Sequence, residues 1–171
     1  MTHSFQDMSL EYFEDNPFKK IGEGFALTTE ADGKINSMTA AWGGVGIMWG
    51  KNVAYVVVRD SRYTKEILDK SDRFSMTFFA EDDKKAKMLL KYMGAVSGRD
   101  EDKIKGAKIT IDRYDGVPYI DEGTLVFICK KLFVSPMNKD FYIDKDIYEK
   151  YYPTGDNHNI FIAEIETMLA R

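Results

Sequence analysis

Strand-forming segments separated by turn residues dominate this chain. Seven segments are rich in β-branched and aromatic residues, several of them with the apolar-polar alternation that is typical of strands. They are residues 24–30, 35–42, 52–58, 73–79, 107–120, 124–134 and 159–169. The Asp32-Gly33 pair between the first two segments is a strong hairpin signal. Strands and helices do not alternate regularly, so a doubly wound parallel sheet is disfavoured.

Helical signals are fewer and shorter. After residue 83 the apolar residues follow the helical spacing up to Gly94, which is predicted as the C-terminal cap. These apolar residues are Ala86, Leu89, Leu90 and Met93. Shorter helices are predicted from residue 63 or 64 and over 146–151. The chain is therefore predicted to be mainly β with flanking helices, a β-barrel with helices packed outside it.

Length and composition set further bounds. A chain of 171 residues with 44% hydrophobic residues fits a single domain over residues 1–171, with 1–20 as an N-terminal extension. The net charge of −4 argues against a nucleic-acid or anionic-membrane partner. No signal peptide or membrane span is recognised. With two histidines, of which His3 stands near the N-terminus, and one cysteine, no metal site is expected.

The single cysteine, Cys129, lies in the apolar segment 124–134 and is predicted to be a buried strand residue. A reactive thiol is the less favoured alternative, because nothing adjacent in the sequence suggests a lowered pKa. One cysteine forms no disulfide within the chain. A reducing, cytoplasmic location is therefore expected.

The segment VVVRDSRYTKEIL predicts an anion site. A buried strand, 52–58, ends at Arg59, and a helix then begins after two hydroxyl residues and a second arginine. Free N–H groups at a helix N-terminus favour negative charge, and guanidinium groups suit phosphate oxygens. The alternative is an ordinary helix cap with two solvated arginines.

Two further segments carry candidate polar groups. GAVSGRDEDKI, residues 94–104, predicts a glycine loop with exposed N–H groups, or alternatively a helix cap followed by a surface turn. His158, at a loop-to-strand junction beside Asp156, is a usable proton donor near neutral pH, or alternatively a hydrogen-bonded surface residue. No hydrolase constellation and no nucleotide P-loop is present in the sequence.

Four segments in order, NSMTAAWGG, VAYVVVRDSRYT, GAVSGRDEDKI and NHNIFIAEIE, resemble the flavin reductase-like family, whose fold is the FMN-binding split barrel and whose relatives include flavoredoxins. The resemblance runs from about residue 22 to residue 168. Two positions depart from the family pattern: Ala41 stands where serine is frequent, and Ala163 where glycine is frequent.

The resemblance implies a set of FMN-binding residues. The strand edge along the flavin ring would be Ser37, Met38, Thr39, Ala40, Ala41 and Trp42. The phosphate turn would be Arg59, Ser61, Arg62, Tyr63 and Thr64. The loop closing over the cofactor would be Ser97, Gly98 and Arg99. His158 matches a frequent histidine close to the flavin and is the candidate catalytic residue.

The resemblance also implies a homodimeric FMN oxidoreductase. In the leading hypothesis it is a flavin reductase that passes electrons from NADH or NADPH through FMN to a small-molecule or redox-protein acceptor. One alternative is a flavoredoxin-like electron-transfer protein without its own nicotinamide site. Another is a split-barrel binding protein without flavin.

Overall fold

The structure is a computed structural model that describes residues 4–171, so His3 lies outside the described part. The strands are β1 (Gln6–Met8), β2 (Phe25–Ala31), β3 (Lys34–Ala40), β4 (Gly43–Met48), β5 (Lys51–Arg59), β6 (Arg73–Phe78), β7 (Ile111–Tyr114), β8 (Val117–Ile120), β9 (Leu125–Pro136) and β10 (His158–Ala170). The helices are α1 (Pro17–Gly22), α2 (Tyr63–Lys70), α3 (Lys84–Ala95), α4 (Lys103–Ala107) and α5 (Lys145–Tyr151), with short 3-10 turns at Leu10–Tyr12 and Lys139–Phe141.

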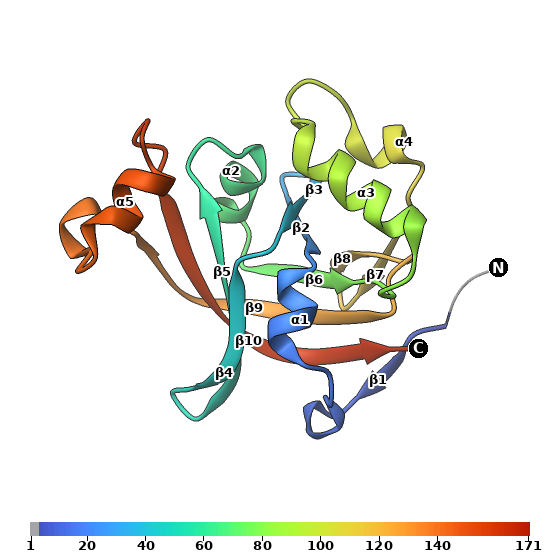
Figure 1. The fold of residues 1–171 in the computed structure, drawn as a ribbon. Coiled ribbons are helices and arrows are strands. Elements are labelled where there is room, and N and C mark those ends of the chain that lie inside the picture. The colour runs from blue at the N-terminus through green and yellow to red at the C-terminus, as the bar shows by residue number, and fades with distance from the viewer. Residues whose placement is uncertain (1–3) are drawn as a thin grey trace.

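One antiparallel sheet forms the body of the molecule. Its strand order is β3-β2-β6-β9-β10-β5-β4, and β7 and β8 form a separate hairpin. The 13-residue β10 has one edge on β9, while its other edge is shared, by β5 near its start and by β1 near its end. The sheet is curved, and α2 and α3 pack against β2 and β3 (Figure 1). The largest fully buried core rings are Phe25, Phe74, Phe78, Phe127 and Phe161.

Most elements predicted from the sequence are present, and the mainly β fold with flanking helices is confirmed. The Asp32-Gly33 hairpin has a positive φ at both turn residues, as a type I′ turn requires. Cys129 is fully buried in β9, and burial raises the pKa of its thiol. The predicted helices at 63 and 146 begin within one residue of those positions.

One helix and one strand end elsewhere than predicted, and one strand was missed. Helix α3 does not stop at Gly94 but continues to Ala95, with Val96 as the C-cap. Strand β3 ends at Ala40 rather than at Trp42, because the chain turns there into β4. Strand β4 was not predicted, since three of its six residues are glycines and glycine weakens strand propensity.

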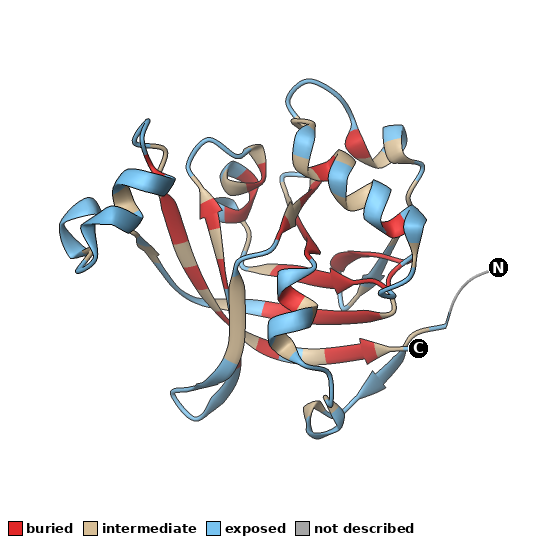
Figure 2. Cartoon of the chain, in the orientation of Figure 1, coloured by how far each residue is buried: buried red, intermediate tan, exposed pale blue. Residues whose placement is uncertain are grey.

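Strand β5 is buried less than predicted. Its Val53, Val56 and Val58 are buried, but Tyr55 is 41% exposed and Val57 is partly exposed. One face of the strand therefore packs in the core, and the other is open where the candidate site lies. In Figure 2 the core strands are red and the β4–β5 hairpin is pale at its tip.

Candidate functional site

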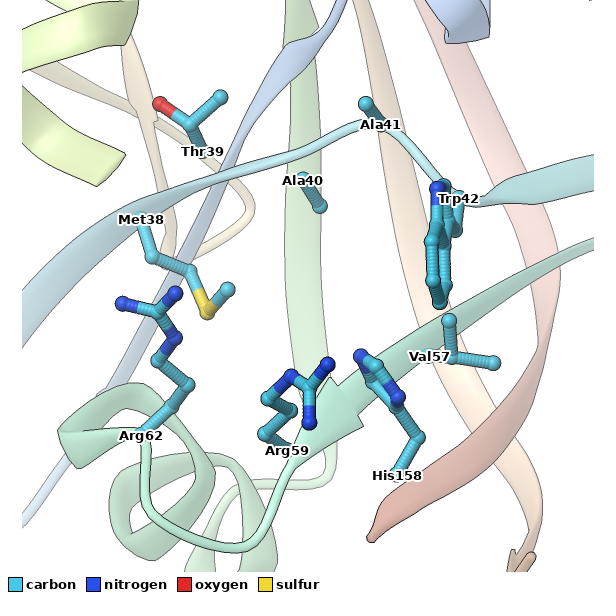
Figure 3. Close-up of a pocket in the computed structure, with 9 residues that line it drawn as sticks. All are labelled: Met38, Thr39, Ala40, Ala41, Trp42, Val57, Arg59, Arg62 and His158. Carbon is cyan, nitrogen blue, oxygen red and sulfur yellow. The ribbon is translucent and has the colours of Figure 1, made fainter. Parts of the chain in front are cut away.

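A cleft of about 180 Å³ lies between the end of β3 and the end of β5. One wall is the run from β3 into the link before β4, and the other is the end of β5, the turn before α2 and the start of β10 (Figure 3). Its lining residues are Met38, Thr39, Ala40, Ala41, Trp42, Val57, Arg59, Arg62 and His158. Eight of these nine were predicted as site residues from the sequence.

Alternation along the first wall decides which side chains face the cleft. Met38 and Ala40 point to the side of the arginines and Trp42 points toward Val57 and His158, whereas Thr39 and Ala41 point away (Figure 3). The Thr39 hydroxyl instead donates to the Leu90 carbonyl of α3. Because Ala40 carries only a methyl group, a flat ligand can approach the backbone of this wall closely. Ala40 thus leaves an open face between the larger side chains of Met38 and Trp42.

Arg59 and His158 lie directly opposite each other in the antiparallel pairing of β5 with β10. The Arg59 guanidinium donates to the backbone carbonyls of Asp156 at 2.8 Å and of Tyr151 at 3.1 Å. It also lies 5.3 Å from the Tyr152 ring centroid. These contacts hold Arg59 in place at the floor of the cleft, between the end of β5 and the loop after α5.

Arg62 enters the cleft from the N-cap position of α2. Its guanidinium donates to the Gly94 carbonyl at the end of α3, at 3.2 Å. Next to it, the buried Lys103 ammonium donates to the Met93 carbonyl at 3.0 Å. Burial, with a smaller contribution from Arg62, lowers the pKa of Lys103 to about 8. Two cations therefore share the C-terminal carbonyls of α3, and this end of the cleft is positive.

His158 is buried, and its imidazole points into the space between Arg59 and Trp42 (Figure 3). The Tyr152 hydroxyl lies 2.8 Å from its Nδ1, and the Trp42 ring centroid is 5.2 Å from its own. Burial first, then the positive charge of Arg59, lowers the pKa of His158 to about 4. The imidazole is therefore uncharged near neutral pH and acts as a hydrogen-bonding group rather than as a charged acid.

The remaining predicted residues lie beside the cleft rather than in its lining. Ser37 is fully buried and its hydroxyl is 3.0 Å from that of Thr28. Thr64 is buried too, and its hydroxyl accepts a hydrogen bond from Asn36 at 2.8 Å. Both residues anchor the strand and the helix that carry the cleft walls.

The glycine loop after α3 packs against the same turn. A side chain at Gly98 would meet the Asn36 amide oxygen at 2.3 Å and the Tyr63 ring at 2.9 Å, so only glycine fits there. Arg99 lies over the Tyr63 ring, donates to the Ser61 carbonyl at 3.0 Å and pairs with Glu66. Ser97 accepts a hydrogen bond from the Arg99 backbone. In this structure the loop holds the turn in place and does not line the cleft.

Three residues that the sequence prediction left out take part in this site. Val57 lines the cleft, Asn36 joins β3 to α2, and Asp156 binds the turn residue Ser61. Val57 follows from strand alternation, two residues before Arg59. Asn36 stands out as a buried amide in a strand, which requires a partner. No local pattern in the sequence pairs Asp156 with Ser61.

A second hollow of about 440 Å³ adjoins the cleft, and Ala41 and Trp42 line both. Helix α1, the start of β4 and Tyr55 complete its walls. Trp42, 46% exposed, therefore separates two hollows of which one is basic and the other mainly apolar.

These observations define a class of protein: an antiparallel β-barrel with outer helices and a basic cleft at a strand edge. A family model described as "flavin reductase like domain" matches residues 24–171, and the chain therefore belongs to the flavin reductase-like family. The family predicted from the four sequence segments is thus confirmed. A comparison with curated proteins gives no significant match.

Solved structures share this fold. An FMN-binding domain of a flavin reductases-like enzyme from Shewanella baltica OS155 matches at a TM-score of 0.70 and 18% identity, covering 99% of this chain and 78% of that one. Flavoredoxin of Desulfovibrio vulgaris (Miyazaki F) matches at 0.65 and 20%, covering 97% and 77%. An NADH:FAD oxidoreductase of Streptomyces globisporus C-1027 matches at 0.63 and 13%, covering 86% and 75%.

The lowered pKa of His158 predicts a specific dependence of stability on pH. The imidazole has a pKa of about 6.5 in the unfolded chain and of about 4 in the fold. The uncharged His158 contributes to the free energy of unfolding, and above pH 6.5 this contribution is fully present. As the pH falls from 6.5 toward 4, the unfolded chain takes up a proton that the folded chain does not, so this contribution is lost.

Urea unfolding of the wild type and of His158→Gln at pH 7 and pH 5 measures this effect. Between these pH values the wild type should lose about 1–2 kcal/mol more unfolding free energy than the variant. The variant serves as the control for the carboxylates, which titrate in both proteins. Equal losses in the two proteins would show that the folded His158 has an ordinary pKa.

Proposed function

We propose that this protein binds FMN in the cleft between β3 and β5 and is a flavin reductase. The observation that carries the proposal is that one cleft brings together two guanidinium groups and a strand edge that is open at Ala40, within a flavin reductase-like fold. Similar structures include FMN-binding proteins and an NADH:FAD oxidoreductase, which supports a redox role for this chain.

The donor set fits a flavin mononucleotide. Arg62, with its guanidinium in the cleft and Lys103 nearby, would bind the phosphate, together with Arg59. The edge from Met38 to Trp42 would lie along the ring, where Ala40 permits close approach. The second hollow beyond Trp42 gives the ring system room on the side away from the arginines.

FMN, when bound, supplies the redox chemistry by accepting a hydride from a nicotinamide and passing electrons to an acceptor. The chain supplies binding and orientation. His158, uncharged and with Nδ1 beside the Tyr152 hydroxyl, would present Nε2–H to the ligand as a fixed hydrogen-bond donor. Trp42 would close one side of the cleft and limit access of water. No side-chain nucleophile is required.

Anaerobic addition of NADH or NADPH to the purified protein with FMN tests the reductase function. We expect tight FMN uptake and rapid loss of the visible absorption of oxidised flavin with one of the two nucleotides. A protein that binds FMN but stays oxidised would exclude the reductase and favour a flavoredoxin-like carrier. A protein that takes up no FMN would exclude both and leave a split-barrel binding protein.

Arg62→Ala should separate FMN from riboflavin. Loss of a charge-assisted hydrogen bond to the phosphate should weaken FMN binding by about tenfold to a hundredfold. Riboflavin, which has no phosphate, should be affected less than about twofold. Titration of flavin fluorescence measures both affinities.

Arg113→Ala is the matched control for Arg62→Ala. It removes the same charge from the surface pair with Glu30, away from the cleft lining, and should leave both affinities unchanged. An equal loss of FMN and riboflavin binding in Arg62→Ala would refute the placement of the phosphate.

We also propose that the protein is a homodimer that uses the β4–β5 hairpin. Ile47 is 73% and Trp49 60% exposed near the hairpin tip, and the Trp49 ring lies 6.5 Å from that of the exposed Phe133 on β9. The pale tip of this hairpin projects from the molecule in Figure 2. Grouped exposed apolar side chains of this kind favour an interface. Contact with a second copy of the chain, as in a dimeric flavin reductase, would cover them.

Trp49→Glu should weaken self-association by about tenfold or more, because it places a charge in the apolar contact. Sedimentation velocity over a range of concentrations measures the change. Met88→Glu, at a 73% exposed position on α3, is the control and should sediment as the wild type does. A wild type that is monomeric at all concentrations would refute the dimer.

A further inference from the structure

The carboxylate of Asp156 occupies the turn to which an anion would bind. One oxygen accepts the Ser61 backbone N–H at 3.0 Å, and the other accepts the Ser61 hydroxyl at 2.6 Å. Arg59 lies 4.0 Å from the same carboxylate. An N–H group, a hydroxyl and a guanidinium before a helix are the donors that a phosphate uses. The chain thus presents its own anion to donors that a phosphate ligand also needs.

The loop that carries Asp156 is held to the turn without this carboxylate. The Asp60 N–H donates to the Asn157 carbonyl at 3.0 Å, and the Asn159 amide donates to the Asp60 carboxylate at 2.6 Å. Arg59 adds its bond to the Asp156 backbone carbonyl. Because these contacts join the same two segments, a purely structural role does not require a charge at position 156.

The Ser61 donors lie one residue before the N-cap of α2, and Asp156 does not cap the helix itself. Arg62, the N-cap residue, makes no side-chain capping bond. The nearby Arg99 is occupied by Glu66 and by the Ser61 carbonyl. Within residues 4–171, the anion that contacts the Ser61 donors is Asp156.

We infer that Asp156 is a specificity-determining residue whose carboxylate competes with the phosphate of a flavin mononucleotide for the Ser61 turn. This inference rests on the proposed function. Binding of a phosphate at Ser61 displaces the carboxylate, and the two negative charges repel each other. Asp156 therefore lowers affinity for phosphorylated flavin relative to riboflavin, which places no charge at the turn.

Asp156→Asn tests the inference because asparagine keeps the shape and removes the charge. Titration of flavin fluorescence should show FMN binding tighter by about fivefold or more, with riboflavin binding changed less than about twofold. Asp60→Asn is the matched control. It removes a charge from the same turn, but the Asp60 carboxylate accepts from Asn159 and not from Ser61. It should give a smaller gain for FMN.

Melting temperatures confirm that each variant folds, and Asp156→Ser, also uncharged, should repeat the gain if Asp156→Asn does not fold. A parallel change for FMN and riboflavin, or an equal gain in Asp60→Asn, would overturn the inference. If neither flavin binds to the wild type or the variant, the proposed function fails. The shift in melting temperature on adding inorganic phosphate then tests the inference. A larger shift for Asp156→Asn than for the wild type supports it, and an equal shift overturns it.

Discussion

The pairing of β10 with β5 is the constraint on which the candidate site depends. The register sets His158 opposite Arg59 at the point where both strands meet the loops, so the two side chains share the floor of the cleft. A shift of β10 by one residue would turn His158 to the other face and away from Arg59, because side chains alternate between faces. The bulges at Ile162/Ala163 and Ile165/Thr167 fall further along β10, on its β9 edge. They leave the register at the cleft undisturbed.

The cleft joins segments that are distant in the sequence through a small number of polar contacts. Asn36 connects β3 to α2, and Arg62 and Lys103 both donate to the end of α3. The close approach of Gly98 to Asn36 adds the loop after α3 to the same cluster. Buried polar groups of this kind are stabilising only when every donor finds its acceptor, so the cleft geometry is sensitive to each of them.

Sequence reasoning predicted the elements whose signals are local. Strand alternation, the Asp32-Gly33 turn and the helix after residue 83 each depend on neighbouring residues, and the structure contains all three. The family segments led to eight of the nine residues of the cleft lining. Strand β4 was missed because its glycines weaken the strand signal. Its turn residue Trp49 has a φ of 52°, a conformation that bulky side chains seldom adopt.

Such local patterns did not predict the long-range contacts. Nothing near Asp156 in the sequence points to Ser61, 95 residues away, because that contact follows from the strand register. The pKa of His158 is likewise set by burial and by Arg59, neither of which is visible in the residues beside it. Sequence patterns thus identified most of the site residues, whereas tertiary packing determines what each of them contacts.

The two tryptophans occupy different parts of the molecule, Trp42 between the two hollows and Trp49 near the tip of the β4–β5 hairpin. Indole emission depends on local polarity and on nearby quenching groups. A chain that keeps only Trp42 would report optically on what enters the hollows, and one that keeps only Trp49 would report on what covers the hairpin. The molecule therefore carries two separate built-in fluorescent probes, one for small ligands and one for association.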